Sequence, residues 1–152
     1  MKKSRKTLLV SIAGVLLAAS AQIAAAPAPA LSYVHVRVVG SSTQGWEFVG
    51  ENALSTSLDH GGAQLRVVTV EIGYGHTPVA KMNGSVLPQS ANYLTTTFCN
   101  YSNFLQECSP GQTVVGFVRY WNLDGHQTGN FWYQNTSTNS PWNTLGDHMT
   151  IL

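Results

Sequence analysis

The sequence has little charge and few cysteines. Asp, Glu, Lys and Arg together make up 10% of its 152 residues, and there are two cysteines. Four of the eight basic residues lie in the first six positions, so the rest of the chain holds four basic and seven acidic residues, a net charge of −3. No basic patch remains there, which argues against a nucleic acid as partner.

Motifs of common enzymes and cofactor sites are also lacking. There is no G-x-S-x-G nucleophile motif, no H-E-x-x-H or H-x-H metal motif and no phosphate-binding loop. We therefore expect no cofactor, and a non-catalytic protein more readily than an enzyme. Ser55, Ser57 and His60 lie close in sequence, but closeness in sequence is not the geometry of a catalytic triad. Paired carboxylates for glycoside cleavage would have to come from Glu47, Glu51 and Glu71.

Long hydrophobic runs are absent except near the N-terminus. A basic head over residues 2–6 precedes an apolar run over residues 8–17, and small residues follow. This order is typical of a secretory signal peptide over residues 1–26, and the run is too short to span a bilayer stably. We predict cleavage after Ala21 or just before Pro27. The mature protein is then secreted or periplasmic and has no transmembrane span.

The mature sequence has the pattern of strands and turns. Alternating prolines predict an extended leader over residues 27–32. Runs rich in β-branched and aromatic residues follow, and the strongest covers residues 65–74. The spacing favours about seven or eight short strands. We predict one all-β domain over residues 33–152, a single antiparallel β-sandwich of the immunoglobulin-like class.

The first predicted strand, residues 33–39, shows a period of two. Val34, Val36 and Val38 alternate with more polar residues, among them His35. Successive side chains of a strand point to opposite faces of the sheet. We therefore expect the three valines to point inward and the polar residues to point outward.

The two cysteines, Cys99 and Cys108, both lie after the predicted signal peptide. In an oxidising compartment the default for such a pair is one disulfide. Because the closed loop is short, its entropic contribution is about 2–3 kcal/mol at most. A redox-active or catalytic thiol would need a C-x-x-C motif or a nearby histidine, so we interpret the pair as a structural staple.

The C-terminal half holds the densest group of aromatic residues. In a strand over residues 130–135, Phe131 and Tyr133 share one face, and Trp132 lies on the other. A sheet with one buried face can bury only one of these sets. We expect Phe131 and Tyr133 in the core and Trp132 on the outside.

Trp132 shares its predicted outer face with Asn130 and Gln134. An exposed indole beside amide side chains is typical of a sugar-binding face, because the ring stacks on a pyranose and the amides bind its hydroxyl groups. Trp142 is a further candidate for this ligand site. The alternative is that Trp132 is covered by a partner chain or by the loop that carries Trp142.

Four residues in predicted turns are weak candidates for a metal site at one end of the sandwich. They are Asp59, His60, His76 and His126. Their residue types suit calcium or zinc, but their spacing matches no metal motif. The other interpretation is that they are solvated turn residues, and we assign no metal.

Several segments resemble a known family. They are YVHVRVV at residues 33–39, the Asp-His-Gly-Gly turn at 59–62, EIGYG at 71–75 with Asn83-Gly84 beyond it, and the tail from Thr128 through Ser137, Asn139 and Pro141. Together they resemble the YolA-like family of small exported bacterial proteins. The resemblance implies export and a single β domain. It implies no catalytic residues, because the family has no established activity.

The sequence thus predicts a secreted, non-catalytic binding module for a cell-surface glycan or protein. Two alternatives stay open. A secreted hydrolase with a site built from loops would need converging acids or a Ser–His pair. A secreted effector acting on competing cells is compatible with the small size and the export signal.

Overall fold

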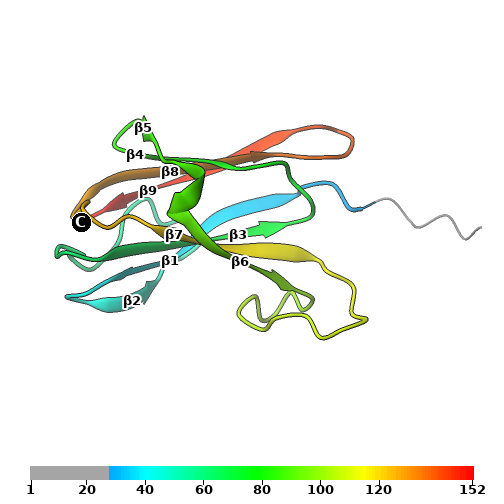
Figure 1. Ribbon diagram of the computed structural model, residues 1–152, viewed down its shortest axis with the longest axis horizontal. Helices are drawn as coiled ribbons and strands as arrows, with labels where there is room; N and C mark the ends of the chain where they lie inside the picture. The colour runs from blue at the N-terminus through cyan, green and yellow to red at the C-terminus, as the bar shows by residue number, and fades with distance from the viewer. Residues whose placement is uncertain (1–27) are drawn as a thin grey trace, which may run out of the picture.

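Alternating apolar and polar side chains build two antiparallel sheets that pack face to face (Figure 1). The computed structural model describes residues 28–152, so the expected signal peptide and its cleavage region lie outside the described residues. One sheet has five strands in the order β2-β1-β3-β7-β6, and the other has four in the order β5-β4-β8-β9. A short 3-10 helix, η1 (Gln89–Ala91), precedes β6.

The strands are short, as the turn spacing predicted. The five-stranded sheet contains β1 (Tyr33–Ser41), β2 (Gly45–Phe48), β3 (Leu65–Ile72), β6 (Asn92–Phe98) and β7 (Gly116–Asn122). The four-stranded sheet contains β4 (Val79–Met82), β5 (Ser85–Val86), β8 (Gly129–Thr136) and β9 (Thr144–Ile151). The order β1-β3-β7-β6 opposite β5-β4-β8-β9 is the A-B-E-D and C′-C-F-G order of the immunoglobulin fold. The predicted sandwich is confirmed, with nine strands in the described part of the chain.

The main core lies between the two sheets. Val67 of β3 and Trp121 of β7 face Phe131 and Tyr133 of β8, and all four are buried. The indole N–H of Trp121 donates to Thr69 Oγ1 at 3.0 Å, so this large ring is buried without an unpaired polar atom. Phe131 and Tyr133 are in the core, as expected.

A bulge in β1 changes the predicted alternation of its valines. The register with β3 shifts between Val36 and Val38, so Val36 faces the main core and Val38 faces the opposite side of the sheet. His35, expected to be outside, is buried because this half of β1 lies against β9. Its Nδ1 is 2.8 Å from Asp147 Oδ2, and the Val36 N–H donates to the same oxygen at 2.7 Å.

The outer face of the five-stranded sheet carries a second, smaller apolar cluster. Val38, Val68, Val70, Phe98 and Val118 form it, and all are buried. Side chains from the loop between β6 and β7 pack against it. The cluster explains why β3 is buried on both faces along most of its length.

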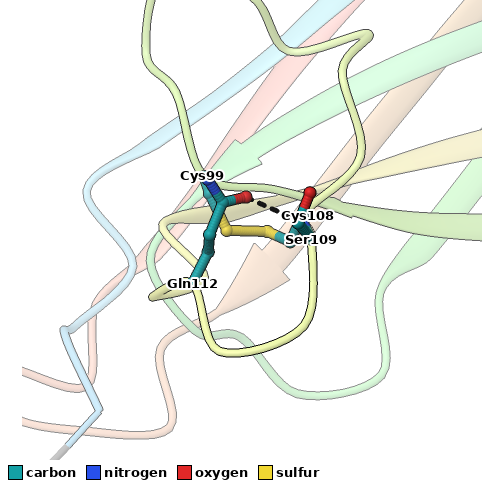
Figure 2. Close-up of a disulfide and its surroundings, with 4 residues drawn as sticks. All are labelled: Cys99, Cys108, Ser109 and Gln112. Atoms are coloured by element: carbon teal, nitrogen blue, oxygen red, sulfur yellow. Dashed lines mark hydrogen bonds between the residues drawn. A yellow bond between two sulfur atoms is a disulfide. The ribbon is translucent and has the colours of Figure 1, made fainter.

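The loop between β6 and β7 is closed by the predicted disulfide (Figure 2). The Cα atoms of Cys99 and Cys108 are 5.3 Å apart, and the Cys108 N–H donates to the Thr97 carbonyl at 3.2 Å. The Ser109 N–H donates to Gln112 Oε1 at 2.7 Å, which ties down the segment that follows. The disulfide therefore fixes the loop to the end of β6.

Residues 28–32 are extended and lie against the end of the sandwich. Ala30 forms a β-bridge with Tyr74, and Leu31 is 1% exposed. The Leu31 N–H donates to Ser137 Oγ at 3.1 Å. The C-terminus lies at the opposite end (Figure 1). Within residues 28–152, we find no helix of the length and apolar character needed to cross a bilayer.

Candidate functional site

Trp46 lies over the backbone of Gly40 on the outer face of the five-stranded sheet. The two residues pair across β1 and β2. A Cβ atom at Gly40 would lie only 2.5 Å from Trp46 Cε3 and 2.8 Å from Cζ3. The absence of a side chain at Gly40 therefore allows the indole to lie over β1. Because Trp46 is still 56% exposed, much of its ring faces solvent.

Two adjoining pockets share Trp46, and we call them together the Trp46 groove. The polar pocket, of about 290 Å³, is lined by Gly40, Ser41, Ser42, Trp46, Gln64, Arg66 and Tyr93. The apolar pocket, of about 260 Å³, is lined by Val38, Trp46, Phe48, Val68, Leu105 and Tyr120. Arg66 and Val68 lie two positions apart on β3, which places both pockets on one face of the sheet.

The single cation of the groove is neutralised. Arg66 Nη2 donates to Asp124 Oδ2 at 3.0 Å, and Nη1 donates to Oδ1 of the same carboxylate. The hydrogen bond from Arg66 holds the pKa of Asp124 below its ordinary value. The guanidinium also lies 5.7 Å from the centroid of the Tyr93 ring. The polar pocket thus offers hydrogen-bonding groups without a free positive charge, which suits a neutral ligand.

The walls of the groove are unusually apolar for a solvent-facing surface. Phe48 is 61% exposed, Leu105 51% and Tyr93 50%. Leu105 belongs to the loop that the disulfide closes, so the disulfide shapes one wall of the apolar pocket. Exposed apolar residues that gather around a hollow mark binding sites more often than isolated ones do.

A second arrangement, Ser41–His60–Glu47, adjoins the polar pocket. His60 Nδ1 is 3.2 Å from Ser41 Oγ, and His60 Nε2 is 2.9 Å from Glu47 Oε2. The sequence predicts that His60 is a solvated turn residue or a weak metal candidate, but the residue is completely buried. Ser55 and Ser57, which lie near it in sequence, are not its partners. The structure thus contains a Ser–His pair, and Ser41 is its serine.

The carboxylate of Glu47 is well supplied with donors. It accepts the N–H groups of Ser57 at 2.7 Å and Leu58 at 3.1 Å as well as the bond to His60. Burial alone would raise its pKa, but these hydrogen bonds outweigh it and lower the pKa below the ordinary value. Glu47 is therefore ionised at neutral pH.

Glu71, another of the acidic residues considered for catalysis, is completely buried in a polar cluster between the sheets. Its Oε1 accepts hydrogen bonds from the Tyr133 hydroxyl and from Asn135 Nδ2, the latter at 2.6 Å. Its Oε2 accepts from Arg119 Nε at 3.1 Å. Burial, followed by the Glu71 charge, raises the pKa of Tyr133 strongly, so Tyr133 stays protonated as a donor. We interpret this cluster as structural.

Trp132, Asn130 and Gln134 lie on the outer face of β8, as their alternation with Phe131 and Tyr133 requires. Trp132 is half-buried, and Lys81 Nζ lies 4.6 Å from the centroid of its ring. Asn130 Oδ1 accepts a hydrogen bond from Thr150 Oγ1 at 2.9 Å. Trp142 is 63% exposed in the loop after β8. Neighbouring side chains therefore already occupy part of the predicted ligand face.

The four metal candidates are not brought together. Asp59 and His60 precede β3, whereas the exposed His76 follows its other end. His126 lies in the loop between β7 and β8. Across residues 28–152, no three His, Cys, Asp or Glu side chains gather as a metal-binding group.

Sequence reasoning missed Trp46. The available signal was the alternation in Trp46-Glu47-Phe48 after Gly45, which is compatible with a short hairpin strand. The pairing with Gly40 is a tertiary feature that the local pattern does not specify.

A protein family described as "Domain of unknown function (DUF4879)" matches residues 26–151. The chain belongs to this family. The match covers all of the described residues except Leu152, and its description assigns DUF4879 no activity. No curated protein and no solved structure matches the chain. The resemblance to the YolA-like family stays a prediction, because the DUF4879 match does not test it.

Proposed function

We propose that the protein is an exported binding module that recognises a neutral cell-surface glycan in the Trp46 groove. The observation that carries the proposal is the position of Trp46. Its indole lies over Gly40, is 56% exposed and is shared by a polar and an apolar pocket. The predicted signal peptide supports an extracellular or periplasmic ligand.

The chemistry of the groove suits a sugar ring. A pyranose presents apolar C–H groups on its faces and hydroxyl groups around its edge, so it can stack on an indole while it binds polar neighbours. Ser42 and Gln64, both exposed, line the polar pocket beside Trp46. Arg66 is already paired with Asp124, so an anionic group on the ligand is not required.

The Trp132 face is the weaker candidate for the same function. Lys81 lies over the Trp132 ring, and a sugar would have to displace this cation before stacking on the same side. No such displacement is needed at Trp46, because its indole packs against the backbone of Gly40. We therefore favour Trp46 over Trp132 as the platform.

The test is a titration of the exported, processed protein with soluble peptidoglycan fragments and neutral polysaccharides. Intrinsic tryptophan fluorescence and calorimetry report binding. Trp46→Ala should weaken binding at least tenfold, and the matched control Trp132→Ala should change it less than twofold. Circular dichroism verifies that both variants fold. Loss of binding in Trp132→Ala alone would move the site to β8. No binding to any glycan would contradict the proposal and favour a protein partner.

A further inference from the structure

Ser41, His60 and Glu47 have the arrangement of a nucleophile, a general base and an orienting carboxylate, and we call the three together the relay. Ser41 lines the polar pocket and is half-buried, whereas His60 behind it is completely buried. The contacts are 3.2 Å from Ser41 Oγ to His60 Nδ1 and 2.9 Å from His60 Nε2 to Glu47 Oε2. A nucleophile within reach of a base that a third group orients is the diagnostic pattern of covalent catalysis.

The count of hydrogens fixes the direction of these bonds. An ionised Glu47 can only accept, so Nε2 of a neutral His60 must carry the ring proton. Nδ1 then has a free lone pair, and the Ser41 hydroxyl donates to it. Compared with the Ser-His-Asp triad, the two imidazole nitrogens exchange roles, but the order of nucleophile, base and carboxylate is the same.

Thr43 competes for the Ser41 hydrogen. Thr43 Oγ1 is 3.1 Å from Ser41 Oγ, and it already donates its own hydrogen to the Gly61 carbonyl. When His60 is protonated, Nδ1 becomes a donor to Ser41, and the Ser41 hydrogen turns to Thr43. Neutral His60 is therefore the form that can accept the serine proton.

We propose that Ser41 is the nucleophile of an ester hydrolase and that the polar pocket of the Trp46 groove holds the ester. Ser41 Oγ attacks the carbonyl carbon while its proton passes to His60 Nδ1. The bond from the carbonyl carbon to the alkoxy oxygen breaks, and that oxygen leaves as an alcohol with the proton from His60. Water then attacks the acyl-Ser41 ester and gives a proton to His60 Nδ1. The bond from the acyl carbon to Ser41 Oγ breaks, His60 returns the proton to Ser41 Oγ, and the acid is released.

The pocket indicates the class of substrate. Its opening beside Trp46 suits a short acyl group on a neutral alcohol, such as an O-acetyl group on a sugar. The Gln44 N–H, which donates to Ser41 Oγ at 3.2 Å, and the side chain of Gln64 are donors that can stabilise the developing oxyanion. The sugar part of this inference rests on the proposed glycan-binding function, whereas ester cleavage does not.

A fluorophosphonate probe tests the nucleophile directly on the unmodified protein. Ser41 Oγ displaces fluoride from the probe, and peptide mass mapping locates the phosphonyl group. We expect labelling at Ser41, no labelling of Ser41→Ala and full labelling of the control Ser85→Ala, which changes an exposed serine of the other sheet. Absence of the adduct on Ser41 of the folded wild-type protein would overturn the proposal, and this result requires no variant to fold.

Hydrolysis of p-nitrophenyl acetate provides the activity readout. Ser41→Ala should lower kcat/KM at least 100-fold, and Glu47→Gln at least tenfold, because a neutral amide no longer fixes the proton on Nε2. Ester turnover without binding of any glycan would contradict the glycan proposal alone, because p-nitrophenyl acetate has no sugar part. Failure of the glycan proposal is thus distinguishable from failure of the relay. A Ser41→Ala variant that hydrolyses the ester at the wild-type rate would refute the relay.

Discussion

Replacement of Arg119 by methionine tests what holds the carboxylate of Glu71 inside the sandwich. Glu71 is completely buried, and the Arg119 side chain, which donates to it, is 14% exposed. Removing one partner of a buried pair leaves an uncompensated charge and costs about 3–5 kcal/mol. Because some water reaches Arg119, we expect Arg119→Met to lower the free energy of unfolding by about 3 kcal/mol.

A second substitution, Glu71→Gln, tests the same explanation. Its effect on the free energy of unfolding should have opposite signs in the wild-type and Arg119→Met backgrounds. In the wild-type background, Glu71→Gln leaves Arg119 without a charged partner and should destabilise by about 1–3 kcal/mol. In the Arg119→Met background, the same substitution removes the unpaired buried charge. It should therefore stabilise the protein, while Tyr133 and Asn135 keep an amide oxygen to donate to.

Urea unfolding followed by tryptophan fluorescence measures both effects, since Trp121 lies in the core. Lys81→Met is the matched control, a surface cation over Trp132 whose loss should cost at most about 1 kcal/mol. The explanation is refuted if Arg119→Met costs less than about 1 kcal/mol, or if Glu71→Gln destabilises both backgrounds equally.

Three further predictions concern the disulfide, the dependence of stability on pH in the acid range, and the Trp46 groove. Serine at both Cys99 and Cys108 should lower the free energy of unfolding by about 2–3 kcal/mol, visible as a lower Tm. Burial opposes ionisation of Asp147, but hydrogen bonds from β1 outweigh it and hold its pKa below 3.8. Its contribution to stability is therefore present above that value and is lost as the pH falls through the lowered pKa. Asp147→Asn should make the free energy of unfolding less dependent on pH in this range, and midpoints of urea unfolding measured across the acid range check it. Gly40→Ala places a Cβ against the indole of Trp46 and should weaken glycan binding at least tenfold by calorimetry, and an unchanged affinity would contradict the role of the bare backbone.

The sequence predicted the parts of the fold in which the local pattern and the tertiary environment agree. Phe131 and Tyr133 are buried and Trp132 faces outward because β8 is a regular strand with one face in the core. Val38 and His35 depart from the prediction because a bulge and a contact with β9 decide their environment. The alternation of β1 contains no signal for either feature.

The candidate site was beyond sequence reasoning for a related reason. The residues next to His60 in the sequence are typical of a solvated turn. Its hydrogen-bond partners Ser41 and Glu47 lie 19 and 13 residues away in the sequence. Trp46 becomes a platform only because β2 folds back so that the ring meets Gly40. Both features depend on how β2 and the following loop return to β1, which spacing alone does not specify.

The contact between β1 and β9 also has a consequence for the order of folding. His35 and Asp147 are 112 residues apart, and Leu31 reaches Ser137 across 106 residues. Sandwiches with such distant pairings fold slowly, because long loops must close before their contacts stabilise anything. If the chain enters its compartment N-terminus first, β1 lacks its contacts with β9 until the C-terminal strand has also entered. For the proposed export route, this delay keeps the polypeptide unfolded during translocation. The chain is then most prone to aggregation just after translocation, before β9 has packed against β1.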